Sequence, residues 1–286
     1  MASSCRTFLA LTLLLGALTF LQWATGTAEA AEKLVVYSGR AERLIKPVLD
    51  EFQAKSGIQI ELLSSGTTEL VNRLQAEGDH TPADVFLTND AGSLEHAREL
   101  KLLRPMNMRE VERAIPSQFR AADNSWIGLS GRFWIVVYNT NLVKPDQIKS
   151  LFDLAQPQWK DKIAVPNSGS EYLQAGAKGQ VAAGIVNHYY IYRHLATQPT
   201  APIAAVMTDQ QEGGMGAIMN VTGIGVTRAS KHVESAKLLI EFLVAQAGQK
   251  MFADLDKEYP LHPDVKADPT LIDRRTFRAA QVPLAR

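Results

Sequence analysis

The sequence of 286 residues contains a single cysteine, no long block of like charge, and no tandem repeat or low-complexity tract. Cys5 precedes the apolar run near the N-terminus, so we expect it to be removed with an export signal. A mature chain without cysteine has no disulfide, no thiolate metal site and no cysteine nucleophile. The formal net charge is zero, which argues against a nucleic-acid partner.

The first thirty residues have the pattern of a secretory signal. Arg6 is followed by an apolar run over residues 8–21, and the segment ends in the small-x-small site Ala28-Glu29-Ala30. We therefore predict that residues 1–30 are a signal peptide and that the mature chain begins at Ala31. The apolar run is too short and wrongly flanked for a stable membrane span, and we expect no span in the mature chain.

The mature chain opens with alternating strand and helix patterns. Residues 34–39, 58–62 and 82–88 are short and rich in β-branched or apolar residues, and helical apolar spacing fills the segments at 42–52 and from 68 onward. This βαβαβ order predicts a parallel sheet whose ligand groups stand on loops at the carboxyl ends of the strands. Those loops cover residues 38–41, 64–67 and 88–92.

Later segments indicate a second lobe. Residues 126–139 form the longest β-rich run and are long enough to cross from one lobe to another, and residues 216–227 resemble a second crossing. A short strand at 163–166 leads into a polar turn at 167–170 that can present backbone N–H groups to an anion at the start of a helix. Residues 234–252 have the apolar stripe of one amphipathic helix.

Tyr189 and Tyr190 are adjacent, which on an exported protein indicates hard-metal chemistry. A phenol binds metal poorly until a strongly Lewis-acidic ion such as Fe(III) displaces its proton, and phenolate is the hard oxygen donor that this ion favours. The alternative is structural, because two adjacent tyrosines also suit a half-buried amphipathic segment.

Seven segments together resemble one family, the periplasmic ferric-ion-binding proteins, which are the substrate-binding components of ABC-type iron(III) importers in the type II superfamily of periplasmic binding proteins. The segments are Val-Tyr-Ser-Gly-Arg at 36–40, the stretch from Glu-Gly-Asp to Asp-Val-Phe at 77–86, Leu-Ser-Gly-Arg at 129–132, Val-Tyr-Asn at 137–139, Trp-Lys-Asp-Lys-Ile at 159–163, Asn-His-Tyr-Tyr at 187–190 and Glu-Tyr-Pro-Leu at 258–261. They occur in the family's order and span almost the whole mature chain.

The resemblance implies a two-lobed α/β "Venus flytrap" with mixed sheets. The first lobe would comprise residues 31–130 and 218–262, and the second lobe residues 131–217 and 263–286. Relatives carry a longer, largely helical insert between the turn at 167–170 and the tyrosine pair, so the second lobe is expected to be shortened near 171–180.

In this family three tyrosines hold the metal, and Tyr138, Tyr189 and Tyr190 occupy the corresponding positions. Three phenolates would balance the three charges of Fe(III) in a poorly hydrated cleft. His188 is a weaker candidate, because in an extended segment its side chain points away from that of its neighbour. Asp90 is either a further ligand or, as we consider more probable, a helix N-cap.

A synergistic anion such as carbonate is the family's way of filling open metal positions. Some members add a histidine and an acid where this chain has Ala41 and Asn89, so we expect the anion here. Its contacts would be Arg40 and Arg132 through their charge, and Ser168, Gly169 and Asn187 as hydrogen-bond donors.

The leading hypothesis is a non-enzymatic, monomeric periplasmic receptor that binds Fe(III) and delivers it to an ABC-type inner-membrane permease. A first alternative is a flytrap receptor for a small anion or organic solute without metal. A second is a secreted hydrolase with Ser130 or Ser168 as nucleophile, although the motifs Gly-x-Ser-x-Gly and His-Glu-x-x-His are absent.

Overall fold

The computed structural model describes residues 32–165, 169–282 and 284. The predicted signal peptide lies outside the described residues, as does Ser168. The sheet has the strand order β2-β1-β3-β8-β4-β6-β5, and β7 and β9 also pair with β4. Strand β4 therefore pairs with four other strands and joins the two ends of the sheet.

The N-terminal part has the predicted βαβαβ order. Strand β1 pairs in parallel with β2 and β3, which confirms the parallel arrangement. The elements are β1 (Lys33–Ser38), α2 (Glu42–Ser56), β2 (Gln59–Ser64), α3 (Thr67–Glu77), β3 (Val85–Thr88), α4 (Ala91–Glu99) and α5 (Arg109–Ala114). Helix α2 buries Ile45, Val48, Leu49 and Phe52 against the sheet, at the spacing of one helix face.

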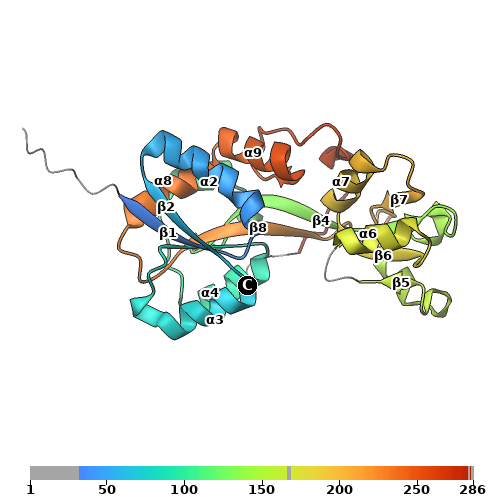
Figure 1. Ribbon diagram of the computed structural model, residues 1–286, viewed down its shortest axis with the longest axis horizontal. Coiled ribbons are helices and arrows are strands. Elements are labelled where there is room, and N and C mark those ends of the chain that lie inside the picture. The colour runs from blue at the N-terminus through green and yellow to red at the C-terminus, as the bar shows by residue number, and fades with distance from the viewer. Residues whose placement is uncertain (1–31, 166–168, 283, 285–286) are drawn as a thin grey trace, which may run out of the picture. The chain divides into compact units, whose positions relative to one another are not determined.

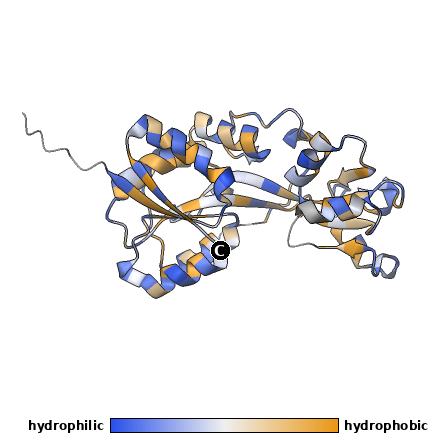
Figure 2. Cartoon of the chain, in the orientation of Figure 1, coloured by the Kyte–Doolittle hydropathy of each residue, from blue (hydrophilic) through white to orange (hydrophobic). Residues whose placement is uncertain are grey.

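A large hydrophobic core fills this part, and we call the region built around it the first lobe. Helices α2, α8 and α9 lie on one side of its sheet, and α3 and α4 lie on the other (Figure 1). In Figure 2 the hydrophobic residues of this lobe lie along the strands and on the helix faces turned toward them. The core is thus a sheet between two helical layers, as expected for an α/β lobe.

The two strands in the middle of the sheet come from the centre of the chain and from its C-terminal half. β4 (Ile127–Asn139) pairs with β8 (Met219–Val226) and β9 (Tyr259–Pro260) through its first half. Its second half pairs with β6 and β7. The predicted crossing at 126–139 is therefore confirmed, with a register shift between Gly128 and Ser130.

The second half of β4 carries a smaller region that we call the second lobe. Its elements are β5 (Ile163–Ala164), α6 (Gly169–Ala177), β6 (Ala183–Asn187), α7 (Tyr189–Thr197) and β7 (Ile203–Val206). Two hydrophobic clusters cover it, one containing Phe133, Ile135 and Val137, the other containing Val136 and Tyr138. Successive residues of a strand point to opposite faces, so the clusters lie on the two faces of the sheet.

The predicted single helix over 234–252 is wrong, because two helices occupy this segment. α8 (Val233–Val244) ends at Ala245, whose ψ of 158° is extended, and α9 (Gln246–Asp256) begins directly after it. The apolar stripe continues through both helices, so hydrophobic spacing alone could not reveal the break. A Cβ on Gly248 would lie 2.9 Å from Leu243 O, which shows how closely the two helices approach at the bend.

Short 3₁₀ helices complete the described chain at Gly78–His80, Ser117–Phe119, Pro145–Gln147, Leu151–Ala155, Pro157–Trp159 and Arg274–Thr276. The predicted lobe boundaries stay a prediction, and so does the shortening near 171–180. In that region α6 continues to Ala177 and a short turn leads into β6, so the segment between the polar turn and the tyrosine pair is ordered around one helix.

The contact between α6 and β6 depends on Gly184. A Cβ there would overlap the ring of Tyr172 and lie 2.7 Å from Ala164 O. We predict that Gly184→Ala lowers the free energy of unfolding by about 1–3 kcal/mol, as overpacking does. Gly176→Ala is the matched control, because its Cβ would lie at an ordinary 3.5 Å from the same tyrosine. Urea denaturation compares them, and equal midpoints would contradict the tight fit.

Candidate functional site

The tyrosine pair opens helix α7, one residue after strand β6 ends at Asn187. The ring centroids of Tyr189 and Tyr190 are 4.5 Å apart, and Tyr189 is 8% exposed. Burial, with a further contribution from the neighbouring Tyr190, raises the pKa of Tyr189 to about 12, against an opposing effect of Arg132. The pair thus presents two adjacent phenols, one of which holds its proton firmly at neutral pH.

Tyr138 lies in a different hydrophobic cluster from Tyr190. It is 5% exposed in the cluster with Val136 and Trp159, whereas Tyr190 packs against the cluster that contains Val137. Val137 and Tyr138 point to opposite faces of β4, and no rotation of a side chain carries a group through a sheet. The structure places Tyr189 and Tyr190 side by side, and the predicted role of Tyr138 as a third ligand stays a prediction.

His188 is completely buried, and its ring lies near those of Tyr189, Tyr192 and Tyr259. Its Nδ1 accepts a hydrogen bond from Phe133 N at 3.2 Å, and its Nε2 donates to Lys257 O at 2.8 Å. Burial lowers the pKa of His188 to about 4, so the imidazole is neutral. Because both ring nitrogens are engaged, neither is free to bind a metal ion in this arrangement.

Asp90 is the N-cap of α4, which was the more probable of its two predicted roles. Its Oδ1 accepts from Ser93 N at 2.7 Å and its Oδ2 accepts from the Ser93 hydroxyl at 2.9 Å. Asn89 beside it donates to Gly39 O at 3.1 Å. The loop after β3 is thus held by its own hydrogen bonds.

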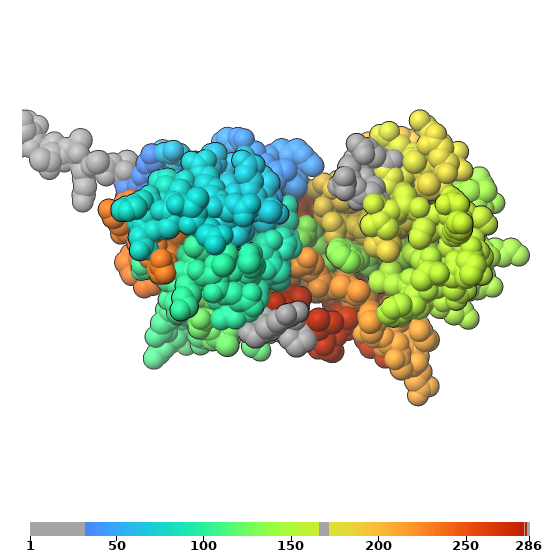
Figure 3. Space-filling model, turned by 90° about the horizontal axis from the view of Figure 1, so that it is seen from below, coloured from blue at the N-terminus to red at the C-terminus, as the bar shows by residue number. Residues whose placement is uncertain are grey.

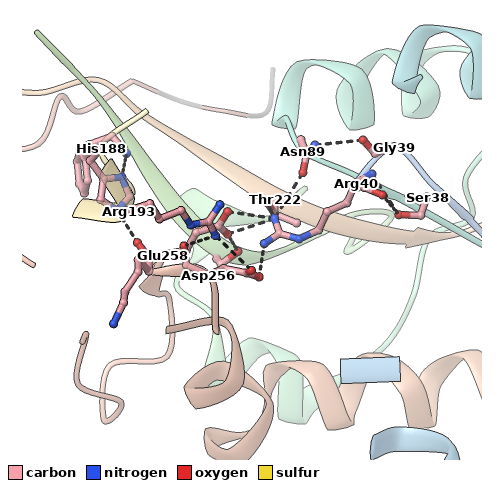
Figure 4. A network of polar contacts seen from close by, with 12 residues as sticks. Ser38, Gly39, Arg40, Asn89, His188, Arg193, Thr222, Asp256 and Glu258 are labelled. Atoms are coloured by element: carbon pink, nitrogen blue, oxygen red, sulfur yellow. Dashed lines mark hydrogen bonds and ion pairs between the residues drawn. The ribbon is translucent and has the colours of Figure 1, made fainter. Parts of the chain in front are cut away.

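Arg40 lies at the end of β1 and is 1% exposed, within the network of Figure 4. One guanidinium nitrogen contacts Asp256 Oδ2 at 2.5 Å. The other contacts Glu258 Oε1 at 3.1 Å and Thr222 Oγ1 at 2.9 Å. Two carboxylates already take up its charge, so the predicted role of Arg40 in holding an anion would have to compete with them.

The carboxylates of this network are buried as deeply as the arginine. Burial acts to raise the pKa of Glu258, but the charges of Arg40 and Arg132 outweigh it, so the pKa lies below its usual value. Ser130 also donates its hydroxyl proton to Glu258. Burial raises the pKa of Asp256, whose Oδ1 also lies 3.6 Å from Arg193.

Arg40 and Arg132 each bury an Nε that has no hydrogen-bond partner among the described residues, but Arg40 is paired with two carboxylates through its other guanidinium nitrogens, and Arg132 forms no such ion pair there. Arg132 lies on β4 and is 6% exposed. Within the described part of the chain the buried Oδ1 of Asn187, at the end of β6, also lacks a partner. Gly169 begins α6, as the polar turn predicted. Unpartnered buried polar groups are costly, which is typical of positions that a ligand completes.

Two cavities adjoin these residues. One, of 410 Å³, is lined by Arg43 from the first lobe and by α6 and α7 residues that include Tyr190, Arg193 and His194. The other, of 420 Å³, lies between the start of α4 and the crossing strands, beside Trp134 and Asn220. Figure 3 shows the face with α3 and α4, which is hollowed between these helices and the second lobe. Tyr190 is half-buried and lines the first of these cavities.

Carboxylates, histidines and cysteines do not build a metal site in the described residues, where no three of them converge suitably. No helix in the described part of the chain has the length and apolarity to span a membrane. Three residues of the network, Asp256, Arg193 and Thr222, were not predicted. Their contacts join segments that are distant in sequence, and no local pattern indicates them.

Comparison with known proteins adds to this geometry. Models of the family of bacterial extracellular solute-binding proteins match residues 125–279 and residues 34–176. The Fe(3+)-binding periplasmic protein of Serratia marcescens is 27% identical, over 95% of this chain and 91% of its own length. Iron uptake protein A1 of Synechocystis sp. is 27% identical, over 80% of this chain and 76% of its own.

A solved structure agrees with the sequence comparison. The ferric binding protein from Campylobacter jejuni superposes with a TM-score of 0.82 at 26% identity, covering 88% of this chain and 93% of that one. Structures of this kind confirm the predicted two-lobed α/β fold. The relatives named here are binding and uptake proteins, which favours a receptor over the hydrolase alternative.

The buried network allows a direct test. Arg40→Gln leaves Asp256 and Glu258 without their main cation, and we predict a loss of about 3–5 kcal/mol in the free energy of unfolding at neutral pH. Arg113→Gln is the control, since that side chain is 73% exposed and its ion pair contributes about 0–1 kcal/mol. Chemical denaturation measures both.

The pH dependence of the same variant has a defined sign. Without Arg40, burial dominates and raises the pKa of both carboxyl groups above their values in the unfolded chain. The folded variant then binds more protons than the unfolded one, so its deficit should shrink as the pH falls from about 7 to about 5. A deficit that stays constant or grows over this range would show that the carboxylates are not the destabilising groups.

Proposed function

The chain belongs to the family of bacterial extracellular solute-binding proteins, and on this premise we propose that it is a ferric-ion receptor that holds Fe(III) with Tyr189 and Tyr190. The observation that carries the proposal is the side-by-side pair of phenols, of which Tyr189 is buried and Tyr190 lines a cavity. The cargo iron of the named relatives agrees with this chemistry.

The donor set suits Fe(III) in particular. Burial raises the pKa of Tyr189 to about 12, so a weakly Lewis-acidic ion would not displace its proton at neutral pH. Fe(III) is acidic enough to do so and favours the resulting phenolate oxygen. Tyr189 and Tyr190 are the donors we assign, and Tyr138 is left out because it lies on the other face of β4.

A small anion, for which carbonate is our candidate, completes the site in this proposal. Two phenolates leave one charge of Fe(III) unbalanced, and a carbonate dianion overcompensates by one. Arg132 supplies the matching positive charge, and its unpartnered Nε is a donor that an anion would satisfy. The polar turn at 167–170 and Asn187 remain further candidate contacts. In this proposal Arg40 acts indirectly: it forms an ion pair with Glu258, whose charge also interacts with that of Arg132.

The biological role follows the family. We propose that the mature protein acts as a periplasmic monomer and delivers iron to an ABC-type inner-membrane permease. One alternative keeps the fold and binds a metal-free anion at Arg132. Titration with ferric citrate separates the two, because phenolate-to-iron charge transfer colours the protein and an anion receptor stays colourless.

The tyrosine assignment is tested with three variants that keep the ring and remove the hydroxyl. We expect Tyr189→Phe and Tyr190→Phe to weaken iron binding by more than about 100-fold, since changes outside the first coordination shell already cost about 10–100-fold. Tyr138→Phe should keep both affinity and colour. Visible spectroscopy during ferric titration measures this. A site in which Tyr138→Phe loses the band, or in which the other two retain it, does not have our donor set.

The anion assignment is tested by removing bicarbonate. Charge-assisted hydrogen bonds contribute about 1.5–3 kcal/mol, so Arg132→Gln should weaken iron binding about 10–150-fold in bicarbonate buffer. In carbonate-free buffer the iron affinity of the wild-type protein should fall and approach that of the variant. The exposed Arg113→Gln variant should follow the wild type in both buffers. Equal wild-type affinity with and without bicarbonate would show that no carbonate takes part.

A further inference from the structure

The turn between α9 and β9, residues 256–258, contacts the fold in two directions (Figure 4). Its carboxylates, those of Asp256 and Glu258, bind Arg40 at the end of β1. Its main-chain carbonyls face α7, where Lys257 O accepts from His188 at 2.8 Å and Asp256 O accepts from Arg193 at 3.2 Å. One turn therefore links a buried arginine of the first lobe to the helix that begins with the tyrosine pair.

The backbone of this turn has an uncommon conformation. Lys257 has φ 58° and ψ 36°, in the left-handed region that few residues other than glycine adopt, and it ends α9. Its side chain pairs with Asp268, away from Arg40. This conformation reverses the chain direction. As a result, the carboxylates of the turn point to Arg40, and its main-chain carbonyls point to His188 and Arg193.

The residues of α7 that reach the turn flank the tyrosine pair. His188 directly precedes it, and Arg193 follows one helical turn after Tyr189, with its guanidinium 4.9 Å from the centroid of that ring. The ring of His188 lies 5.8 Å from that of Tyr189. The other ring nitrogen of His188, Nδ1, accepts a hydrogen bond from Phe133 N on β4. The ring of Tyr189 thus lies between two residues, His188 and Arg193, that contact β4 and the turn.

We propose that His188 is a positioning residue for the tyrosine pair and acts through its hydrogen bond to Lys257 O. The inference rests on the proposed function, in which the tyrosines are metal ligands. A buried hydrophobic side chain could fill the same space, but it could not fix the start of α7 to the turn that carries the Arg40 carboxylates. His188 directly precedes Tyr189, so fixing its ring also fixes the backbone from which the tyrosine side chains project.

Two variants separate positioning from packing. In His188→Gln the side-chain amide can still donate at the position of Nε2, whereas in His188→Asn the amide reaches only the position of Nδ1 and keeps the contact to Phe133. Each variant loses one ring hydrogen bond, so a purely structural role predicts similar effects. Positioning predicts near-wild-type iron affinity for His188→Gln, and for His188→Asn an affinity about 10–100-fold weaker with a shifted charge-transfer band.

A second measurement does not depend on iron. Hydrogen exchange of the metal-free protein should be faster in His188→Asn than in wild type at the amides of residues 189–193 and 257–259, and unchanged there in His188→Gln. Equal exchange in the two variants, or equal iron affinity, overturns the proposal. If wild type itself shows no charge-transfer band, the proposed function fails, and the exchange comparison still decides whether His188 ties α7 to the turn.

Discussion

The buried contact of Arg40 with Asp256 and Glu258 is the interaction on which the arrangement of the site depends. Burying three charged groups is costly, and hydrophobic side chains of similar volume often give equal or greater stability. Hydrophobic side chains, however, would not fix the orientation of the turn as directional hydrogen bonds and ion pairs do. The carboxylates hold the turn after α9 against the end of β1, and the carbonyls of the same turn contact α7. The cluster is thereby linked, through this turn and Arg193, to the helix that begins with the tyrosine pair.

The opening of the fold was predictable because its patterns are local. Helical spacing between β-branched runs gave the βαβαβ unit, and the length of the run at 126–139 gave the crossing strand. The placement of Tyr138 was not predictable in this way. Residues 135–138 are all large and apolar or aromatic, so no alternation marks which face turns toward the ligand, and a shift by one residue reverses the result.

The polar residues of the site also divide into those whose role is set by neighbouring residues and those whose role is set by distant parts of the chain. Asp90 follows a strand and precedes a helix, so its role as an N-cap could be read from neighbouring residues. Arg40 and Asp256 are 216 residues apart, and their contact depends on how α9 returns to the sheet. A loop arginine in a sequence looks solvated or free for a ligand, and only the folded chain shows that two carboxylates occupy it. Both arginines bury an unpartnered Nε in the described part of the chain, and Arg132, which we considered slightly less probable from the sequence, forms no ion pair with a carboxylate there.

The alternation of β4 also bears on how a receptor parts with its cargo. Tyr138 supports the packing around Trp159, and Tyr172 donates its hydroxyl proton to Val137 O at 2.6 Å, so two further phenols of the second lobe serve the sheet. In a site with two phenolates, two protons are enough to replace both protein donors. In the proposed site, release of the iron would therefore need fewer protein–metal bonds broken than a site with three phenolates would, and the proposed carbonate could leave first.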